Sequence, residues 1–506
     1  MNNTNLSKAD FDSVVQQRTA LWSQLELLGD PRTITSLADN SILDVDSYKL
    51  CHQALYNIIG VTKAFSYTEP RITNEMMFYV GRQIWLKNMK PITMKMIDQA
   101  EEFFAAHIIG GREMFPRADW ECVVKEFNGY PPLRIRGVPE GTVLPSQNAL
   151  TTIEVDEEKY PQLAWMGAYY ETSFLRAEWY PVTVASRSLK VRKMMKRYLE
   201  LTSNVPVEEA VAFMFHDFGA RGVSSKESAG IGGFAHLSTG ALGTDTITGA
   251  IYANEFYNCA MSAFSVFATE HSIMTMRGKD GELQTVNDLI DIYSKGGPGT
   301  IVSIVSDGYN IFDLAKSYTE GELKEKILRT GIKLVVRPDS GNAVEVILKL
   351  LKIFEDGFGV TTNSKGYKVL NIVRILQGDG LSHPSDFEAI LAAVKNAGFS
   401  IENMVFGQGG GLLQQVNRDT YKFAMKTSAA YIDGEWKKVY KDPITDSGKR
   451  SKAGRLTTVR LTSGSIATVD RDNMPEGAVD LMVDIWYAGN LLVEYTLDEI
   501  RERANN

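Results

Sequence analysis

The sequence is poor in the residues that build disulfide frameworks and metal sites. Its 506 residues include three cysteines, Cys51, Cys122 and Cys259, which lie far apart and form no Cys-x-x-Cys pair. A disulfide framework and a structural zinc site are therefore not expected, and a reducing compartment fits. The six histidines are widely spaced and no His-Glu-x-x-His motif occurs. We therefore predict no dedicated metal ligands among the side chains.

Long apolar runs and an excess of basic residues are also missing. No apolar run approaches the roughly 18 residues that a membrane span needs, and residues 1–10 lack the basic and apolar segments of a signal peptide. The 54 Lys and Arg are outnumbered by 62 Asp and Glu, which gives a net charge of −8. This balance argues against nucleic acid as the main partner. We expect a cytoplasmic protein with no membrane or nucleic-acid partner.

Three common motifs of nucleotide and ester chemistry are absent. There is no Gly-x-x-x-x-Gly-Lys-Ser/Thr sequence, so a P-loop is excluded. The glycines at 230–233 and 407–411 do not fit Gly-x-Gly-x-x-Gly followed by a ribose-binding acid, which argues against a Rossmann dinucleotide site. No Gly-x-Ser-x-Gly nucleophile elbow occurs.

What the chain does contain is a repeated strand–loop–helix pattern. The apolar runs are short, rich in β-branched residues and nearly continuous, which is typical of strands buried on both faces of a parallel sheet. Each run ends in polar or glycine residues: 211–215 before His216-Asp217-Phe218, 300–305 before Ser306-Asp307, 333–336 before Arg337-Pro338-Asp339, 373–376 before Gln377-Gly378-Asp379, and 403–406 before Gly407-Gln408-Gly409. Helical patterns lie between them, for example at 384–398, where Ser385 and Glu388 predict a capping box.

This rhythm predicts an α/β fold, an irregular, TIM-like α/β barrel over residues 180–425 with its site at the carboxyl ends of the strands. Residues 1–40 are polar and predict an N-terminal extension. Residues 41–179 combine amphipathic helical patterns with short strands, and residues 426–506 return to short alternating strands. We expect these two stretches to form one flanking α+β domain built from both chain ends.

The strand ends carry groups that suit a phosphorylated sugar and an aromatic base. Gly409 to Gly411 precede a predicted helix start, where exposed backbone N–H groups attract phosphate, and Arg418 follows. Asp339 and Asp379 are candidates for a ribose diol or hydrated Mg²⁺, and Phe218 offers a flat aromatic face. The alternative for each turn is an ordinary cap or loop residue. The basic run 449–452 is either a solvated loop or a site for a small polyanion.

Many of these segments resemble the nicotinamide phosphoribosyltransferases, a type II phosphoribosyltransferase family. The matching segments run in consistent order from about residue 42 to the C-terminus: Asp46-Ser47-Tyr48-Lys49, 216–225, 229–232, 243–246, Glu270-His271-Ser272, 305–307, 337–341, 363–368, 377–380, 409–414, Lys441-Asp442-Pro443 and 449–452. Motifs of this length are highly specific. Local departures include Gln408 within the glycine loop and Phe267 before Ala268.

The resemblance implies a homodimer with shared active sites that transfers phosphoribosyl from phosphoribosyl pyrophosphate to nicotinamide, with Mg²⁺ as cofactor and ATP as co-substrate. It implies that Phe218 stacks on the pyridine ring, that Tyr48 of the other subunit covers its second face, and that Asp245 accepts from the carboxamide. The remaining implied residues are Arg221 and Arg337 for the base and phosphate region, Asp339, Gly378 and Asp379 for ribose, Gly409, Gly410 and Arg418 for the 5′-phosphate, and Lys426, Lys441 and Lys449 for the polyphosphate. Ser265 and Ser303 complete the substrate-binding set, and His271, the implied phosphohistidine, joins Arg337, Asp339 and Asp307 as catalytic.

Two alternatives remain beside this interpretation. A nicotinate phosphoribosyltransferase is the nearer one, but the carboxylate of Asp245 would repel that of nicotinate by roughly 1 to 4 kcal/mol at about 4 Å. The other is a barrel of a different class, either a non-catalytic phosphosugar-binding protein or an aldolase. An aldolase needs a Schiff-base lysine at a strand end, whereas Lys333 opens its strand.

Overall fold

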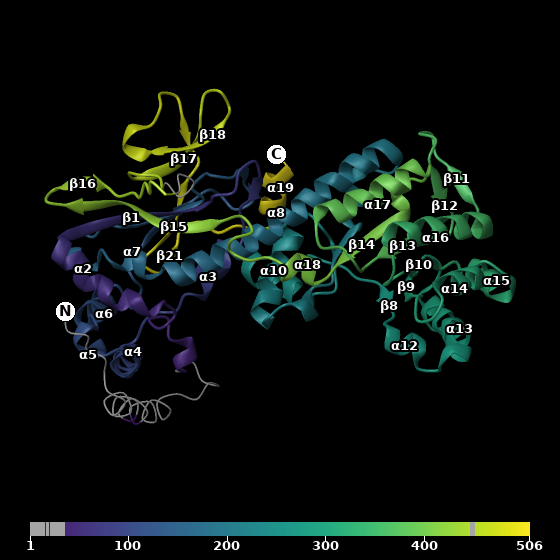
Figure 1. Cartoon of the computed structure of the whole chain (residues 1–506), viewed down its shortest axis with the longest axis horizontal. Helices are drawn as coiled ribbons and strands as arrows, with labels where there is room; N and C mark the ends of the chain where they lie inside the picture. Colours follow the sequence, from purple (N-terminus) through teal and green to yellow (C-terminus); the bar gives the residue numbers. More distant parts are fainter. Residues whose placement is uncertain (1–15, 17–19, 21–35, 446–450, 506) are drawn as a thin grey trace. The chain divides into compact units, whose positions relative to one another are not determined.

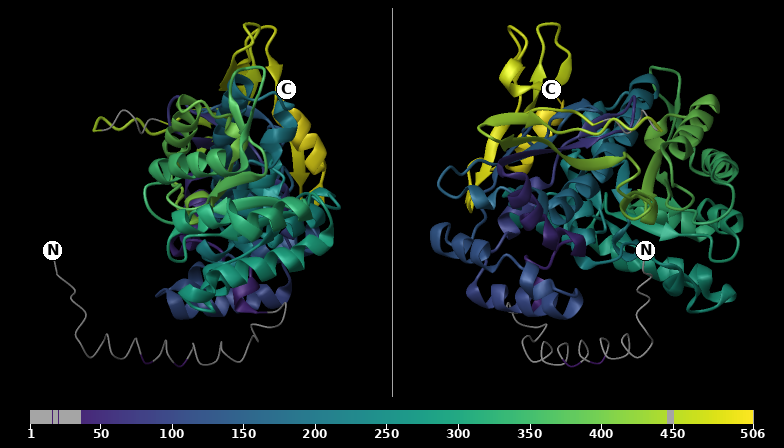
Figure 2. Two further views of the ribbon diagram at one scale, coloured as in Figure 1. Left: turned by 90° about the vertical axis from the view of Figure 1, so that its right-hand side faces the viewer. Right: turned by 60° about the vertical axis from the view of Figure 1, so that its left-hand side comes forward.

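The computed structural model describes residues 36–445 and 451–505, together with Gln16 and Ala20. The chain divides into two compact units (Figures 1 and 2): unit 1 is Met1–Trp179 with Arg418–Glu494, and unit 2 is Tyr180–Asn417 with Tyr495–Asn506. The second stretch of the predicted flanking domain began at residue 426 and ran to the C-terminus. The compact units instead assign residues 418–425 to unit 1 and Tyr495–Asn506 to unit 2. Most of the predicted extension, residues 1–40, lies outside the described residues.

Unit 2 is built on a parallel sheet of seven strands in the order β7-β6-β14-β13-β10-β9-β8. Their apolar side chains, such as Val302, Ile304, Leu334 and Ile375, are fully buried. The predicted α/β class with buried parallel strands is therefore confirmed. The bounds are β6 Phe215–Asp217, β7 Gly243–Thr244, β8 Phe267–Ala268, β9 Ile301–Val305, β10 Lys333–Arg337, β13 Val373–Gln377 and β14 Met404–Gln408.

The two edges of this sheet approach each other. Gly243 of β7 forms an isolated parallel bridge with Phe264, and the Phe264 amide donates to the Leu242 carbonyl at 2.7 Å. A few residues later the same segment becomes β8, which pairs with β9. The stretch from Phe264 to Ala268 thus contacts the strands at both edges.

Helices connect the strands of unit 2, and α16 and α17 lie beside the sheet (Figure 1). The predicted capping box of α17 is wrong in its residues: the cap is His383, which pairs reciprocally with Asp386, while Glu388 bonds Arg197. Among the described residues, no helix is both long and apolar enough for a membrane crossing. The bounds are α8 Glu171–Thr202, α9 Val207–Ala212, α10 Lys226–Ser238, α11 Ile247–Tyr257, α12 His271–Thr275, α13 Glu282–Tyr293, α14 Ile311–Tyr318, α15 Gly321–Thr330, α16 Ala343–Phe358, α17 Pro384–Asn396, α18 Gly410–Leu413 and α19 Leu497–Asn505, with the hairpin β11 Val360–Thr362 and β12 Lys368–Leu370.

Unit 1 contains an antiparallel sheet in the order β16-β15-β1-β5-β3-β20-β21. Strand β1 pairs with β5 on one side and with β15 on the other, so segments from both parts of the chain alternate within one sheet. The strands are β1 Val61–Pro70, β2 Met76–Phe78, β3 Arg134–Gly137, β4 Val143–Pro145, β5 Thr151–Val155, β15 Phe423–Ile432, β16 Glu435–Lys438, β17 Leu456–Arg460, β18 Ile466–Asp470, β19 Val479–Asp480, β20 Val483–Tyr487 and β21 Asn490–Leu491. The helices are α2 His52–Ile59, α3 Arg82–Asn88, α4 Met94–His107, α5 Gly111–Met114, α6 Arg117–Glu126 and α7 Met166–Tyr169.

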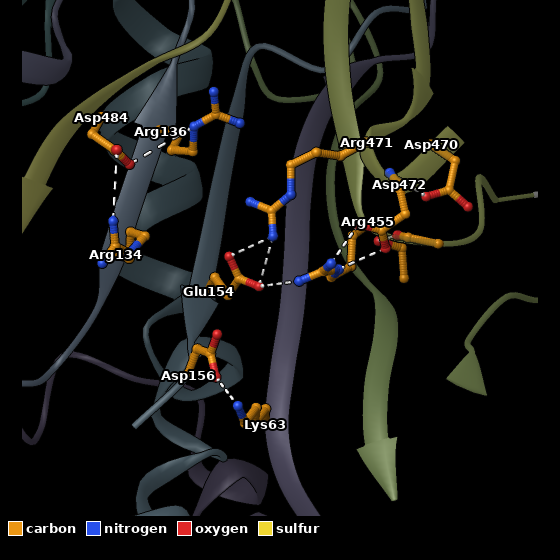
Figure 3. Close-up of polar contacts among 12 residues, drawn as sticks. Lys63, Arg134, Arg136, Glu154, Asp156, Arg455, Asp470, Arg471, Asp472 and Asp484 are labelled. Carbon is orange, nitrogen blue, oxygen red and sulfur yellow. Dashed lines mark hydrogen bonds and ion pairs between the residues drawn. The ribbon is translucent and has the colours of Figure 1, made fainter. Parts of the chain in front are cut away.

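An ion-pair network crosses one face of this sheet (Figure 3). Both carboxylate oxygens of Glu154 on β5 accept from Arg471 at 3.0 Å, and one oxygen lies 3.5 Å from Arg455. Arg455 also bonds Asp472, and Lys63 of β1 pairs with Asp156. The Glu154 side chain is only 5% exposed. Because a buried carboxylate is stable only when paired, this network fastens the segment around β17 and β18 to the main sheet.

A buried carboxylate also joins two loops at the strand ends of unit 2. Asp217, the last residue of β6, is fully buried and accepts from the Gly219 amide at 2.7 Å. Its other oxygen lies 3.4 Å from the Thr244 hydroxyl, and its backbone carbonyl accepts from the Asp245 amide at 2.9 Å. The loops after β6 and β7 are therefore held together through one residue. Burial raises the pKa of Asp217 to about 6, against the effect of these hydrogen bonds.

We predict that Asp217 makes stability depend on pH. Because its native pKa lies above the ordinary value of 3.8, the native state binds the proton more tightly, and wild-type stability falls as the pH rises from about 4 to about 6. The side chain of Asp217→Asn does not ionise. As the pH rises over this range, the free energy of unfolding of the variant should therefore increase by about 2 to 3 kcal/mol relative to that of wild type.

Urea unfolding of both proteins from about pH 4 to about pH 7 measures this difference. Asp433→Asn, in an exposed turn, is the control and should follow wild type. A gap between Asp217→Asn and wild type that stays constant with pH would contradict an ionising, buried Asp217.

Candidate active site

The carboxyl ends of the parallel strands in unit 2 bring most of the predicted site residues to one edge of the sheet. The pairing is in register there: Arg337 pairs with Val305, and Gln408 pairs with Asp217. Parallel strands in register end at the same level, so the loops that follow them are neighbours. The predicted residues in unit 2 are Phe218, Arg221, Asp245, Ser265, His271, Ser303, Asp307, Arg337, Asp339, Gly378, Asp379, Gly409 and Gly410.

His271 lies between two carboxylates at this edge. Its Nε2 is 3.1 Å from Oδ1 of Asp307, and its Nδ1 is 4.0 Å from Oδ2 of Asp339. The imidazole is 46% exposed while Asp307 is only 7% exposed. His271 is the first residue of α12, whose position leaves the ring accessible. An accessible imidazole oriented by a buried carboxylate is suited to accept and release a proton or a phosphoryl group.

Asp307 also organises the neighbouring loop. Its second oxygen accepts from the Asp339 amide at 3.1 Å and from the Ser340 hydroxyl at 2.5 Å. Arg337 in turn donates to Asp339 at 3.2 Å, and its Nε is buried with no partner among the described residues. Gly378 is packed against this group, since a Cβ there would lie 3.2 Å from Oδ1 of Asp339. The loops after β9, β10 and β13 are thus in direct contact.

The ends of β6, β7 and β14 form a second part of the site. The Phe218 ring lies against Gly407, where a Cβ would come within 1.9 Å of the ring, so this position requires glycine. The exposed Asp245 accepts from the Ser265 hydroxyl at 2.8 Å. Arg221 is exposed on the short helix Ala220–Gly222. A partly exposed aromatic ring with a carboxylate on the next strand end is suited to a planar, hydrogen-bonding base.

A cavity of about 760 Å³ lies within unit 2; of the residues just named only Ser265 lines it, and Ile301, Lys333 and Asn371 line it at the opposite, amino-terminal ends of β9, β10 and β13. Ser265, Ser303 and His216 line it together with apolar side chains such as Leu376 and Val405. Burial lowers the pKa of His216, which favours its neutral form. The cavity is large enough for a small aromatic ligand.

The glycine loop after β14 leads into a helix of four residues, α18, which starts two residues before the predicted start at Leu412. Helix α18 begins at Gly410, with Gly409 as its N-cap. The loop approaches the one after β6 so closely that a Cβ on Gly222 would lie 3.0 Å from the Gly410 Cα. The two loops are therefore packed backbone against backbone at this point.

The other predicted residues lie in unit 1. Tyr48 is 59% exposed on the short helix Ser47–Cys51, and burial of its hydroxyl, with Glu171 and Asp46 nearby, raises its pKa. Arg418 is exposed and bonds its neighbour Asp419. Lys449 lies outside the described residues.

Lys426 belongs to a cationic cluster that extends beyond the predicted residues. Burial lowers its pKa; Glu171 opposes this shift, while the positive charges of Arg71, Lys441 and Lys49 add to it. The sequence reasoning missed Arg71, because no motif marks it and it follows a strand about 350 residues away from Lys426. The pairing of β1 with β15 brings the two together, and Arg71 Nη2 is buried with no partner among the described residues. This cluster is suited to a polyanion.

Comparisons with known proteins show which family the chain resembles. The model of the Nicotinate phosphoribosyltransferase (NAPRTase) family matches residues 213–472, and that of the nicotinamide phosphoribosyltransferase N-terminal domain matches residues 40–135. The chain is 42% identical over 475 residues to a nicotinamide phosphoribosyltransferase of Xanthomonas campestris, an alignment that covers 92% of this chain and 98% of the relative. A nicotinamide phosphoribosyltransferase of Acinetobacter baylyi is 33% identical, covering 74% and 76% of the two chains.

Solved structures with low sequence identity share the fold. A nicotinate-nucleotide pyrophosphorylase from Pyrococcus furiosus superposes with a TM-score of 0.60 at 16% identity, covering 94% of this chain and 97% of that one. Human nicotinic acid phosphoribosyltransferase gives 0.53 at 13% identity, covering 91% and 92%. The family models, the extent of the Xanthomonas alignment and the shared fold together show that the chain belongs to the nicotinamide phosphoribosyltransferase family.

Proposed function

We propose that this protein transfers the phosphoribosyl group of phosphoribosyl pyrophosphate to nicotinamide, giving nicotinamide mononucleotide and pyrophosphate in NAD salvage. The observation that carries the proposal is the convergence, on one edge of the sheet, of the Phe218 ring, the Asp245–Ser265 pair and the group formed by His271, Asp307 and Asp339. The names of the curated relatives support the same reaction. The direct test is product analysis with nicotinamide and nicotinate side by side, with and without ATP.

The fold proposed for this reaction is an irregular, TIM-like barrel in unit 2 with a second α+β domain in unit 1. The bridge between Gly243 and Phe264 supports closure of the seven-stranded sheet. A closed sheet collects all strand ends around one opening, where barrel enzymes hold their substrates.

Base recognition is assigned to the second part of the site. The pyridine ring stacks on Phe218, and the carboxylate of Asp245 accepts from the carboxamide NH₂. Ser265 already donates to Asp245 at 2.8 Å and fixes the direction of that carboxylate. Nicotinate would present a second carboxylate to Asp245, and the two charges repel. Since nicotinamide is a weak, neutral nucleophile, holding its ring nitrogen over C1 of the ribose supplies much of the rate.

The departing pyrophosphate gathers negative charge as the bond to C1 breaks. Arg337 is placed to stabilise that charge, because its Nε is buried without a partner among the described residues. Asp339, Gly378 and Asp379 would contact the ribose, and Gly409 and Gly410 the 5′-phosphate, for which the resemblance also implies Arg418. Lys426, Lys441 and Lys449 would serve the polyphosphate, and the cationic cluster adds Arg71 to that set.

The acidic strand ends fit Mg²⁺ that is bound mainly by the substrate. No group of three or more His, Cys, Asp or Glu side chains in the described ranges is arranged to hold a metal ion. In phosphate sites, Mg²⁺ usually takes one or two carboxylates and completes its shell with phosphate oxygens and water. The carboxylates of Asp307 and Asp339 would supply these ligands, and the bound ion would neutralise part of the pyrophosphate charge.

ATP is the proposed co-substrate, with His271 as the residue that it phosphorylates. Asp307 orients the ring through Nε2, and a phosphoryl group would add negative charge beside Asp307 and Asp339. Such a group alters the reaction only if substrates and products bind the two forms of the enzyme differently.

The proposed assembly is a homodimer with shared active sites. The exposed ring of Tyr48 in unit 1 supports this arrangement, because the resemblance assigns it to the second face of the base bound in the partner. Exposed apolar side chains gather on unit 2 near Ser265, among them Phe264, Val266, Phe267 and Met261. An exposed patch of this kind marks a contact surface.

We predict that Asp245→Asn raises the KM for nicotinamide at least tenfold and reduces the preference of the enzyme for nicotinamide over nicotinate. A hydrogen bond to a charged group is worth roughly 1.5 to 3 kcal/mol, and the substitution removes the charge that repels nicotinate. Steady-state kinetics with each base measures both effects. Ser265→Ala is the comparison, with a smaller effect because the carboxylate remains. An unchanged preference in folded mutant protein would remove Asp245 from base selection.

We predict that two inactive variants restore activity when mixed. Tyr48→Ala disables the part of the site given to the partner, and Asp339→Ala disables the strand-end part. After random exchange, one site of each heterodimer is intact, so about a quarter of the wild-type sites return. Activity is measured after exchange of differently tagged subunits has been demonstrated. Exchange without recovery would argue against shared sites.

We predict that His271→Ala abolishes nicotinamide-dependent ATP hydrolysis and the stimulation of transfer by ATP, while some ATP-independent transfer remains. The reason is that no other group would carry the phosphoryl intermediate. Asp307→Asn keeps the imidazole but weakens its orientation, so it should reduce the coupling only in part. Phosphate release and acid-labile phosphohistidine are the measurements. Full ATP stimulation in His271→Ala would rule out this role.

A further inference from the structure

The loops after β13 and β14 are joined by a buried amide that no motif explains. Gln408, the last residue of β14, is 3% exposed. Its Nε2 donates to the Leu381 carbonyl at 2.9 Å and lies 3.5 Å from the Ser382 carbonyl. The side chain therefore holds the start of the glycine loop against the loop that carries Gly378 and Asp379.

A second side chain joins the same two loops independently. Arg187 on α8 donates to the Ser382 carbonyl at 2.6 Å and to the Gln415 carbonyl at 3.1 Å. Ser382 lies in the loop after β13, whereas Gln415 follows α18. The guanidinium of Arg187 therefore links the two segments. Two side chains from different elements thus converge on the carbonyls of residues 381 and 382.

The two loops are in close contact at Gly411. A Cβ on Gly411 would lie 2.6 Å from the Leu381 carbonyl oxygen and 2.9 Å from Nε2 of Gln408. Within the first loop, the Gln377 side chain donates to the Asp379 carbonyl at 2.8 Å. The separation of Gly378 and Asp379 from Gly409 and Gly410 is consequently fixed by side-chain hydrogen bonds rather than by the strands alone.

We infer that Gln408, together with Arg187, is a positioning residue that sets the fit of the ribose 5-phosphate part of phosphoribosyl pyrophosphate. This inference rests on the proposed function, which assigns ribose to one of the two loops and the 5′-phosphate to the other. The hydrogen bonds of Gln408 and Arg187 described above end on the backbone of Leu381, Ser382 and Gln415, whereas the base-binding group is formed by Asp245 and Ser265 at other strand ends. A change in the separation of the two loops should therefore weaken the binding of phosphoribosyl pyrophosphate and leave the binding of nicotinamide nearly unchanged.

The sharpest variant is Gln408→Glu, which preserves shape. It replaces a donating NH₂ with an oxygen that faces two carbonyl oxygens, so the two loops are pushed apart. Gln408→Met keeps the volume, removes the donor and introduces no repulsion, and Arg187→Met removes the second link. Displacing a substrate-binding group by about 1 Å costs up to a hundredfold in rate.

A matched control lies just before the other end of the same strand. Asn403 is fully buried, and its Nδ2 donates to the carbonyls of Lys368 and Ser400 at 2.9 and 2.7 Å. Asn403→Asp makes the same chemical change as Gln408→Glu, because a carboxyl group replaces an amide that faces two carbonyls. Asn403 lies away from the strand ends that carry the site. It therefore reports what a purely structural amide does.

The experiment measures the Kd of phosphoribosyl pyrophosphate by calorimetry, the KM of each substrate and the melting temperature. We expect Gln408→Glu to raise the Kd and KM for phosphoribosyl pyrophosphate about tenfold or more, Gln408→Met and Arg187→Met to raise them less, and the KM for nicotinamide to stay within about twofold. Asn403→Asp should lower the melting temperature without this selectivity.

The positioning role would be overturned by results in the variants or in the control. In the variants, such a result is an unchanged Kd for phosphoribosyl pyrophosphate in folded Gln408→Met and Arg187→Met, or an equal rise for both substrates. In the control, it is the same selective rise in Asn403→Asp. Failure of the proposed function would look different, because wild type would then form no nicotinamide mononucleotide. Calorimetry with phosphoribosyl pyrophosphate alone still tests the positioning role in that case.

Discussion

The in-register pairing of parallel strands in unit 2 is the constraint on which the site depends. Thr244, Asp217 and Gln408 end adjacent strands in register, and Gln377 ends the next strand opposite Phe406. Because parallel strands share one direction, their carboxyl ends lie at one edge, and segments that are far apart in the sequence become neighbours. A shift of one residue in any of these strands would turn its side chains to the other face of the sheet. Register therefore decides which residues reach the substrate.

Strand register alone does not fix the loops, and buried polar groups complete the arrangement. Asp217 joins the loops after β6 and β7, Asp307 joins those after β9 and β10, and Gln408 joins those after β13 and β14. Each of these groups is nearly or fully buried, so breaking its bonds leaves an unsatisfied polar atom, which costs about 1 to 3 kcal/mol. Three separate links of this strength keep the loops in place without a bound ligand.

The sequence predicts those parts of the structure that depend on local patterns. Continuous apolar runs located the buried strands, and the polar residues after them located Asp307 and Asp339 at one edge, whereas His271 was predicted only from the family resemblance. The capping of α17 was wrong, because the Ser385 pattern competes with a local pair between His383 and Asp386 that short-range rules do not rank. Arg71 was missed because its partner strand is remote in the sequence. Pairings between distant segments leave no mark in a single sequence, so contacts such as those of Gln408 and Arg187 emerge only from the fold.

The charges of the two units differ in a way that bears on how a polyanion is bound. The strand ends of unit 2 carry Asp217, Asp245, Asp307, Asp339 and Asp379, whereas unit 1 concentrates Lys49, Arg71, Lys426 and Lys441 around Glu171. An acidic edge alone would repel a pyrophosphate. It suits a substrate that arrives with Mg²⁺, since carboxylates then complete the shell of an ion whose other ligands are phosphate oxygens. Lys426 retains a lowered pKa among like charges, and an anion near it would relieve that repulsion. Under the proposed function, Mg²⁺ would offset the negative charge of the strand ends in unit 2, and an anion would offset the positive charge of the cationic cluster in unit 1.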